Sequence, residues 1–158
     1  MDTNKIKVLL AITIIAFLLT ITSNFRKKRK VKRKIKKLAR NKKEISPEEF
    51  FQLRKKKGKG REYLSNKYNF SGVYILYNYT KKMYYVGQAQ KIFSRVNSHF
   101  TGKGNGDVYA DYKYGDRFGI RMIALKKSKY KNLNDLERDA IETYSAYSRG
   151  YNKTRGNR

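Results

Sequence analysis

The distribution of apolar and polar residues divides the chain into three parts. Residues 6–25 are almost wholly apolar, residues 26–43 are mostly basic, and only further on do apolar and polar positions intermix. A helix of twenty residues rises about 30 Å, which is roughly the thickness of a bilayer core. The pattern predicts a transmembrane anchor over residues 1–25, a basic linker over residues 26–67 and a folded domain over residues 68–158.

The basic block sets the predicted orientation of this anchor. Thirteen of the eighteen residues from 26 to 43 are Lys or Arg, beginning with Arg26, Lys27, Lys28, Arg29 and Lys30. Positive residues beside a membrane segment stay in the cytoplasm, so we expect a single-pass protein with its N-terminus outside and its C-terminal domain in the cytoplasm. The block suits anionic lipid headgroups, at about 1 kcal/mol per residue, or, as the second interpretation, DNA phosphates. A cleaved signal peptide is the alternative for the apolar run, although no small-residue cleavage site follows it.

The linker contains the start signal of a short helix. Ser46 suits the N-cap, Pro47 suits the first helical position, and Glu49 completes a capping box. Lysines and glycines follow from Gly58 onward and favour a flexible segment. We therefore predict a short helix over about residues 46–57 within the linker.

The pattern in the third part predicts a mixture of strands and helices. Aromatic and branched residues on both sides of a polar turn predict a hairpin over residues 71–87. Apolar residues at helical spacing predict helices over residues 91–100 and 132–147, and a third strand fits residues 117–127. The glycine-rich segment 101–107 lacks the Lys-Ser/Thr ending of a phosphate-binding loop and follows no strand. The domain is therefore expected to be α+β.

Charge and composition limit the possible partners. The formal net charge is +27, far beyond what solubility requires, so we expect a polyanionic partner such as nucleic acid or an anionic membrane. The chain has no cysteine and a single histidine, which excludes disulfides and zinc sites built from Cys or several His.

Five short motifs follow one another in the domain, and together they resemble the GIY-YIG nuclease family. Each motif alone is weak, because short aromatic and glycine patterns arise by chance. Their common order and spacing over about residues 70–155 make the resemblance specific, with Val in place of Ile in the first two. The motifs are Gly72-Val73-Tyr74, Tyr85-Val86-Gly87, Arg95 with His99, Leu136-Glu137 with Ile141, and Gly150-Tyr151-Asn152.

The resemblance implies a small three-stranded antiparallel sheet flanked by helices and a site that cuts nucleic acid with one divalent cation, Mg²⁺ or Mn²⁺. By this likeness Glu137 would hold the metal, Tyr74 would help to activate water, and Arg95 would stabilise the phosphate. Three further residues, Tyr85, His99 and Asn152, would complete the catalytic site. Gly72 and Gly87 would be structural glycines of the motifs.

The residue types suit this chemistry on physical grounds as well. A carboxylate can hold a hard cation that generates a nucleophile, and arginine offers a two-pronged donor to phosphate oxygens. A tyrosine beside a cation can serve as a base, and His99 could accept or relay its proton.

Each assignment has a structural alternative. The tyrosines could be ordinary strand aromatics, Arg95 could simply contact phosphates, and Asn152 could belong to a turn. Glu137 could close a capping box with Asn134, and His99 could be a cation at a helix end.

These observations together predict a membrane-anchored, metal-dependent endonuclease that cuts DNA. RNA is left open as a substrate. We expect low sequence specificity, because no helix-turn-helix or zinc module follows the domain. A non-catalytic membrane tether for nucleic acid is the alternative from another class, and an exported nuclease would result if the first segment were cleaved.

Overall fold

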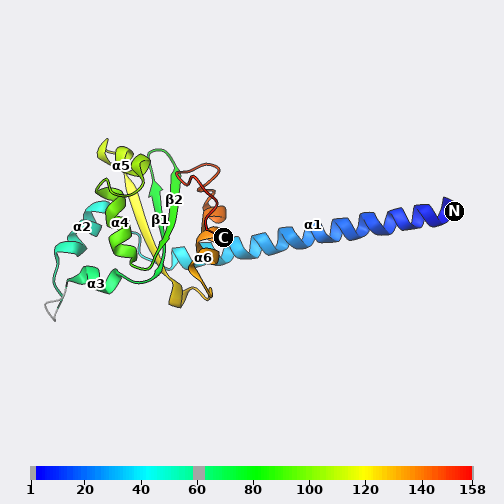
Figure 1. Ribbon diagram of the computed structural model, residues 1–158, viewed down its shortest axis with the longest axis horizontal. Coiled ribbons are helices and arrows are strands. Elements are labelled where there is room, and N and C mark those ends of the chain that lie inside the picture. Colours follow the sequence, from blue (N-terminus) through cyan, green and yellow to red (C-terminus); the bar gives the residue numbers. More distant parts are fainter. Residues whose placement is uncertain (1–2, 59–62, 158) are drawn as a thin grey trace. The chain divides into compact units, whose positions relative to one another are not determined.

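The computed structural model describes residues 3–58 and 63–157 (Figure 1). The chain divides into two units, residues 1–34 and residues 35–158. The elements in chain order are α1 (Thr3–Arg40), α2 (Pro47–Lys55), α3 (Leu64–Tyr68), β1 (Gly72–Asn78), β2 (Met83–Ala89), α4 (Ile92–Phe100), α5 (Gly106–Lys113), β3 (Phe118–Ala124), a 3-10 turn η1 (Leu125–Lys127) and α6 (Leu133–Tyr144).

The first unit consists of the N-terminal part of α1. Its large apolar side chains between Leu9 and Phe25 are 51 to 66% exposed, except for that of Ile21, which is half-buried. Among the residues that the structure describes, no helix is both long and apolar enough to cross a membrane. The transmembrane segment predicted over residues 1–25 is therefore not confirmed.

The second unit begins at Ile35, well before residue 68, where the sequence placed the start of the domain. Ile35 and Phe50 are completely buried, and the ring of Phe50 stacks on Phe93 with the centroids 4.1 Å apart. Ile45 exchanges two backbone hydrogen bonds with Ile120 of β3, at 3.1 and 2.8 Å. The predicted linker thus contributes to the core, because its apolar side chains cover the sheet.

The start of α2 confirms the predicted capping box. The Glu49 N–H donates to Ser46 Oγ, and the Ser46 N–H donates to Glu49 Oε2 at 3.0 Å. The helix ends at Lys55, slightly earlier than expected. Of the two glycines expected after it, Gly58 is described and Gly60 lies outside the described residues.

The sheet has the order β2-β1-β3, with both pairs antiparallel, as the α+β expectation required. The hairpin turn is held by Asn78, whose Oδ1 accepts from the N–H groups of Thr80 and Lys81 at 2.9 and 3.0 Å. The third strand ends at Ala124, and the last three residues of the predicted strand form η1 instead.

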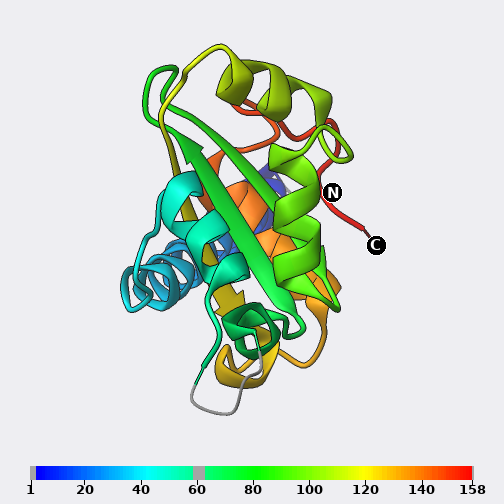
Figure 2. The same ribbon diagram turned by 90° about the vertical axis from the view of Figure 1, so that its left-hand side faces the viewer.

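Helices cover both faces of this sheet. In Figures 1 and 2, α2 and α4 lie on one face and α6 lies on the other. The main core lies under α2 and α4, where Tyr74 and Leu76 of β1 meet Phe50 and Val96. The central strand β1 is thus enclosed, whereas β2 and β3 present the two edges.

Candidate active site

The centre of the candidate site is a hydrogen-bonded pair on β1 and α4. Tyr74 is 1% exposed and His99 is fully buried, and Tyr74 Oη lies 2.8 Å from His99 Nε2. The other ring nitrogen, Nδ1, accepts a hydrogen bond from the backbone N–H of Asn105 at 2.8 Å. Because a backbone N–H only donates, Nδ1 carries no proton, and the neutral ring holds its proton on Nε2. His99 therefore donates to Tyr74 Oη.

This arrangement keeps His99 neutral. Burial, with a smaller contribution from the Arg95 charge, lowers the pKa of His99 to about 4. The alternative of a charged histidine stabilising the end of α4 does not agree with this pKa. The relay role predicted for His99 is also not supported, because one nitrogen already accepts a bond and the other already carries the proton.

Burial acts in the opposite direction on the two tyrosines. It raises the pKa of Tyr74 strongly and also raises the pKa of Tyr85, while the nearby Arg95 guanidinium partly offsets both effects. The ring of Tyr85 lies 4.8 Å from that of His99. Tyr74 thus needs positive charge nearby to lose its proton near neutral pH.

Two glycines make room for this pair. Gly87 of β2 is the register partner of Tyr74, and a Cβ on Gly87 would overlap the Tyr74 hydroxyl. A Cβ on Gly104 would lie 2.6 Å from His99 Nδ1. Only glycine lets both segments approach so closely. Gly72 has a similar role, since a Cβ there would collide with the carbonyl of Ile123 on β3.

Glu137 of α6 reaches the same region from the outer edge of β2. Its Oε1 accepts from the Gln88 N–H at 3.1 Å, and its Oε2 accepts from the Gln88 side-chain Nε2 at 3.0 Å. The N-cap of α6 is Asn132, which accepts from the Asp135 N–H, so Glu137 does not close a capping box with Asn134. The local alternative for Glu137 is therefore wrong.

A cavity of about 390 Å³ brings most of the predicted residues together. Its lining includes Tyr85, Arg95, Glu137 and Asn152, together with Lys153. Arg95 is exposed, one turn from the buried His99, so the two residues of this motif point to different environments. Tyr74 and His99 lie behind Tyr85, within ring contact of it.

The donor set of this cavity suits a single cation. Glu137 is 8% exposed, and within the described residues no salt bridge neutralises its carboxylate. A buried carboxylate without a cationic partner is costly, and a bound divalent ion would remove that cost. No group of three or more His, Asp or Glu side chains suited to a metal occurs in the described part of the chain, so phosphate and water oxygens would supply the other ligands.

Asn152 has a supporting position in the structure. Its Oδ1 accepts from the Val86 N–H at 2.9 Å, and its Nδ2 donates to the Val86 carbonyl at 2.7 Å. The Tyr151 N–H donates to the Tyr84 carbonyl at 2.9 Å. The Asn152 carboxamide thus pairs with the backbone of β2 as a neighbouring strand would. The closing segment, Gly150-Tyr151-Asn152, covers this edge of the sheet, and Asn152 forms part of the wall of the cavity.

Two residues of the site were not predicted from the sequence. Gln88 holds the Glu137 carboxylate, and Asn105 fixes the proton of His99 while its side chain caps α5. Gln88 directly follows the second glycine motif, but nothing in the sequence showed that α6 packs beside it. Asn105 carried the signal of an N-cap, although its bond to His99 uses the backbone and has no sequence signal.

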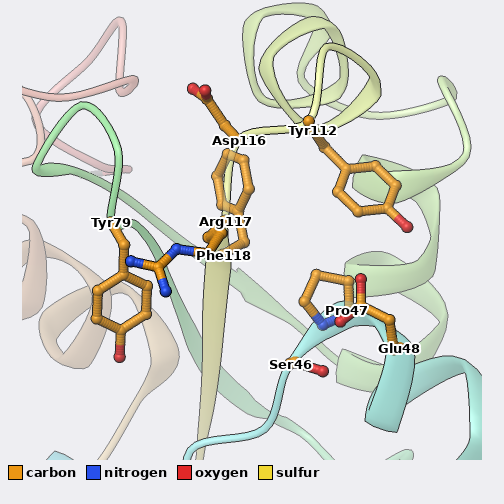
Figure 3. A pocket seen from close by; sticks show the side chains of 9 residues that line it. Ser46, Pro47, Glu48, Tyr79, Tyr112, Asp116, Arg117 and Phe118 are labelled. Carbon is orange, nitrogen blue, oxygen red and sulfur yellow. The ribbon is translucent and has the colours of Figure 1, made fainter.

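A second pocket shows that size alone does not identify the site. It has a volume of about 580 Å³ and lies between the start of α2 and the start of β3 (Figure 3). Of its two acidic residues, Glu48 and Asp116, Asp116 already accepts a bond from Asn78 at 2.7 Å, and the Arg117 guanidinium lies 6.0 Å from the Tyr79 ring centroid. None of the predicted site residues lines it.

No residue of the basic block, 26–43, is among the described residues that line the cavity at Glu137. Arg26, Lys27, Lys28, Arg29 and Lys30 are exposed on the part of α1 that belongs to the first unit.

Comparison with known proteins agrees with the arrangement around β1, β2, α4 and α6. The family model of the GIY-YIG catalytic domain matches residues 70–152, a range that contains all six predicted catalytic residues. No curated protein and no solved structure matches the chain significantly.

Proposed function

Since the chain belongs to the GIY-YIG family, and is therefore a GIY-YIG-type endonuclease acting on nucleic acid, we propose that it hydrolyses DNA phosphodiester bonds with one divalent cation and little sequence specificity. The observation that carries this proposal is the convergence of Tyr85, Arg95 and Glu137 on one cavity, with the Tyr74–His99 pair directly behind. GIY-YIG nucleases generally use divalent metal ions, and Mg²⁺ is the ion we propose, with Mn²⁺ as a substitute.

Each side chain has a distinct task in the proposed reaction. Arg95 is exposed at the cavity and offers its guanidinium to the non-bridging oxygens of the phosphate. A divalent cation, if held by Glu137, would supply positive charge where the transition state gains negative charge. Positive charge near Tyr74, that of Arg95 included, would favour the ionised form of Tyr74, whose oxygen would take the proton of the attacking water while the departing oxygen takes a proton from solvent.

His99 supports Tyr74 as a hydrogen-bond donor. Its Nε2–H points at Tyr74 Oη, so negative charge on that oxygen is stabilised as the hydroxyl proton leaves. The hydrogen bond from the Asn105 N–H to Nδ1 holds the orientation of the His99 ring, so that Nε2–H and not the acceptor Nδ1 faces Tyr74. We propose that Tyr85 and Asn152 maintain the shape of the cavity, the first by ring contacts and the second through β2.

A plasmid-nicking assay tests the proposal. Removing the first 45 residues would take the buried Ile35, Ala39 and Ile45 out of the core, so the full chain in detergent is the appropriate sample. We expect Glu137→Gln and Arg95→Ala to lower the Mg²⁺-dependent nicking rate by about 10²- to 10³-fold or more. Glu142→Gln, on the exposed side of the same helix, is the matched control. Equal nicking by wild type and Glu137→Gln would remove the assignment.

Metal binding gives a readout that does not depend on turnover. We expect Glu137→Gln to weaken binding of Mn²⁺, followed by electron paramagnetic resonance, while Arg95→Ala leaves it nearly unchanged. Loss in both variants would point to a disturbed fold instead of a lost ligand.

We also propose that the enzyme is attached to a membrane, with the catalytic domain in the cytoplasm. The exposed apolar side chains between Leu9 and Phe25 support attachment, and the basic residues that follow them support the orientation and lipid contact. A reporter fused after Arg158 should be active inside the cell and silent outside. The reverse result would contradict the orientation, and recovery of the chain in the soluble fraction would contradict attachment.

A further inference from the structure

The two edges of the sheet are finished differently. Along β2, the outward carbonyl of Tyr84, the N–H and carbonyl of Val86 and the N–H of Gln88 have partners in Tyr151, Asn152 or Glu137. Along β3, Ile45 forms hydrogen bonds with the outward backbone groups of Ile120 alone. Backbone groups alternate in direction along a strand, so those of Met122 and Ala124 also point outward. Among the described residues, none forms a hydrogen bond with the outward groups of Met122 and Ala124, and this stretch of β3 is an open edge.

A groove of about 700 Å³ lies along this open edge. Its floor is apolar. It is formed by residues of α2, α3 and β3, and by one residue each from the segments just before α2 and β1. The floor residues are Ile45, Leu53, Tyr68, Phe70, Met122 and Ala124. Because β3 and β2 are opposite edges of the sheet, the groove is separate from the catalytic cavity.

The rim of the groove is strongly positive. Six lysines surround the apolar floor, and Glu49, the only acidic residue among the described residues that line the groove, is paired with one of them at 3.0 Å. The lysines are Lys42, Lys43, Lys56, Lys67, Lys126 and Lys127. A second copy of a chain with a net charge of +27 is a poor occupant for such a rim.

We propose that this groove binds a single strand of nucleic acid. In a duplex the base faces are stacked on one another and only base edges, sugars and phosphates are accessible, so aromatic side chains on an apolar floor would find no base face to stack on. A single strand presents bare base faces, which can stack on Tyr68 and Phe70, and phosphates, which can reach the lysines and the outward N–H groups of β3. The groove thus selects substrates that carry a single-stranded segment, held at the edge of the sheet opposite to the catalytic cavity.

The choice of ligand rests on the proposed nuclease function, but the binding test does not. Full-length protein carrying Glu137→Gln is titrated, in detergent, against labelled oligo-dT and against a duplex of the same length. We expect Lys67→Glu/Lys126→Glu to weaken oligo-dT binding by at least about tenfold and to reduce its salt slope by about 0.7 per lost phosphate contact. The control Lys113→Glu/Arg149→Glu has the same charge change at exposed positions outside the groove lining.

Tyr68→Ala separates stacking from charge. We expect it to weaken oligo-dT binding several-fold with an unchanged salt slope, and to leave duplex binding unchanged. Equal weakening of oligo-dT and duplex by the groove and control variants would overturn the proposal. The proposal would also be overturned if Lys67→Glu/Lys126→Glu left oligo-dT binding unchanged but abolished flotation of the protein with phosphatidylserine vesicles, because the groove would then be a lipid site. Failure of the nuclease proposal would appear elsewhere, as absence of nicking by the wild type.

Discussion

The backbone N–H of Asn105 donates to Nδ1 of His99, and this bond determines where the only histidine of the chain keeps its proton. A protonated ring would direct an N–H against another N–H, and burial adds to the cost of the charge. The state of His99 therefore links a glycine-rich loop to the tyrosine at the centre of the sheet.

Stability should fall between about pH 7.5 and pH 5 because of this residue. The pKa of His99 is about 4 in the folded chain, against an ordinary value of 6.5. The unfolded chain therefore binds the extra proton first, and stability is lost as the pH decreases through 6.5 toward 4. Over this interval we expect a loss of about 2 kcal/mol in the free energy of unfolding, measured with urea. With no second histidine present, His99→Gln should flatten this dependence, and an unchanged slope would contradict the pKa assignment.

Gly87→Ala should disturb the site through the tyrosine that it faces. The new Cβ would overlap the Tyr74 hydroxyl, so the ring or the strand must shift. We expect about 10²-fold lower nicking and a loss of about 1 to 3 kcal/mol in stability. Gly106→Ala is the control for stability alone, because a Cβ there meets nothing within 4 Å but Gly106 lines the catalytic cavity. Wild-type activity for Gly87→Ala would show that Tyr74 tolerates displacement.

The sequence predicted this part of the molecule well for a physical reason. Hairpin residues are close neighbours in the chain, so the turn formers and the aromatic and branched residues around them were sufficient to predict the hairpin over residues 71–87, whereas the register that pairs Tyr74 with Gly87 comes from the structure. The partner of Glu137 could not be predicted, because Gln88 lies 49 positions away and meets it only after α6 packs on the sheet. The spacing of four residues also places Arg95 and His99 on one face of a helix. It could not show that the loop at Gly104 buries His99 and leaves Arg95 exposed.

Gln88→Leu should weaken metal binding without removing a ligand. The side chain of Gln88 donates to Glu137 Oε2 at 3.0 Å and to Asn134 Oδ1 at 2.8 Å, which holds the carboxylate in one orientation. Loss of such a supporting bond lowers metal affinity by about 10- to 100-fold. Mn²⁺ titration would measure the change, with the exposed Gln90→Leu as control. Equal affinities for both variants would mean that α6 and the backbone N–H of Gln88 orient Glu137 without the Gln88 side chain.

Asn152→Ala should act on stability more directly than on chemistry. It leaves the Val86 N–H and carbonyl without their partners, at a cost of about 1 to 3 kcal/mol. Amide exchange of Val86 should accelerate, whereas the exposed control Asn66→Ala should not change it. If Asn152→Ala abolished nicking with Val86 still protected, Asn152 would belong to the catalytic groups after all.

Phe50→Ala tests where the folded unit begins. The sequence assigned Phe50 to a linker because lysines and glycines follow it and because a short capped helix does not show what it packs against. In the structure the ring is fully buried and stacks on Phe93 of α4, the helix that carries Arg95 and His99. Removing it should lower the free energy of unfolding by about 3 to 5 kcal/mol, because an aromatic-sized cavity would remain in the core.

Phe25→Ala is the control, since Phe25 is 65% exposed on α1 and its loss should leave the free energy of unfolding almost unchanged. Urea unfolding of the full chain, followed by circular dichroism in the same detergent, would compare the two. Equal midpoints would make α2 an appendage, whereas the expected difference makes α2 part of the support for the catalytic helix.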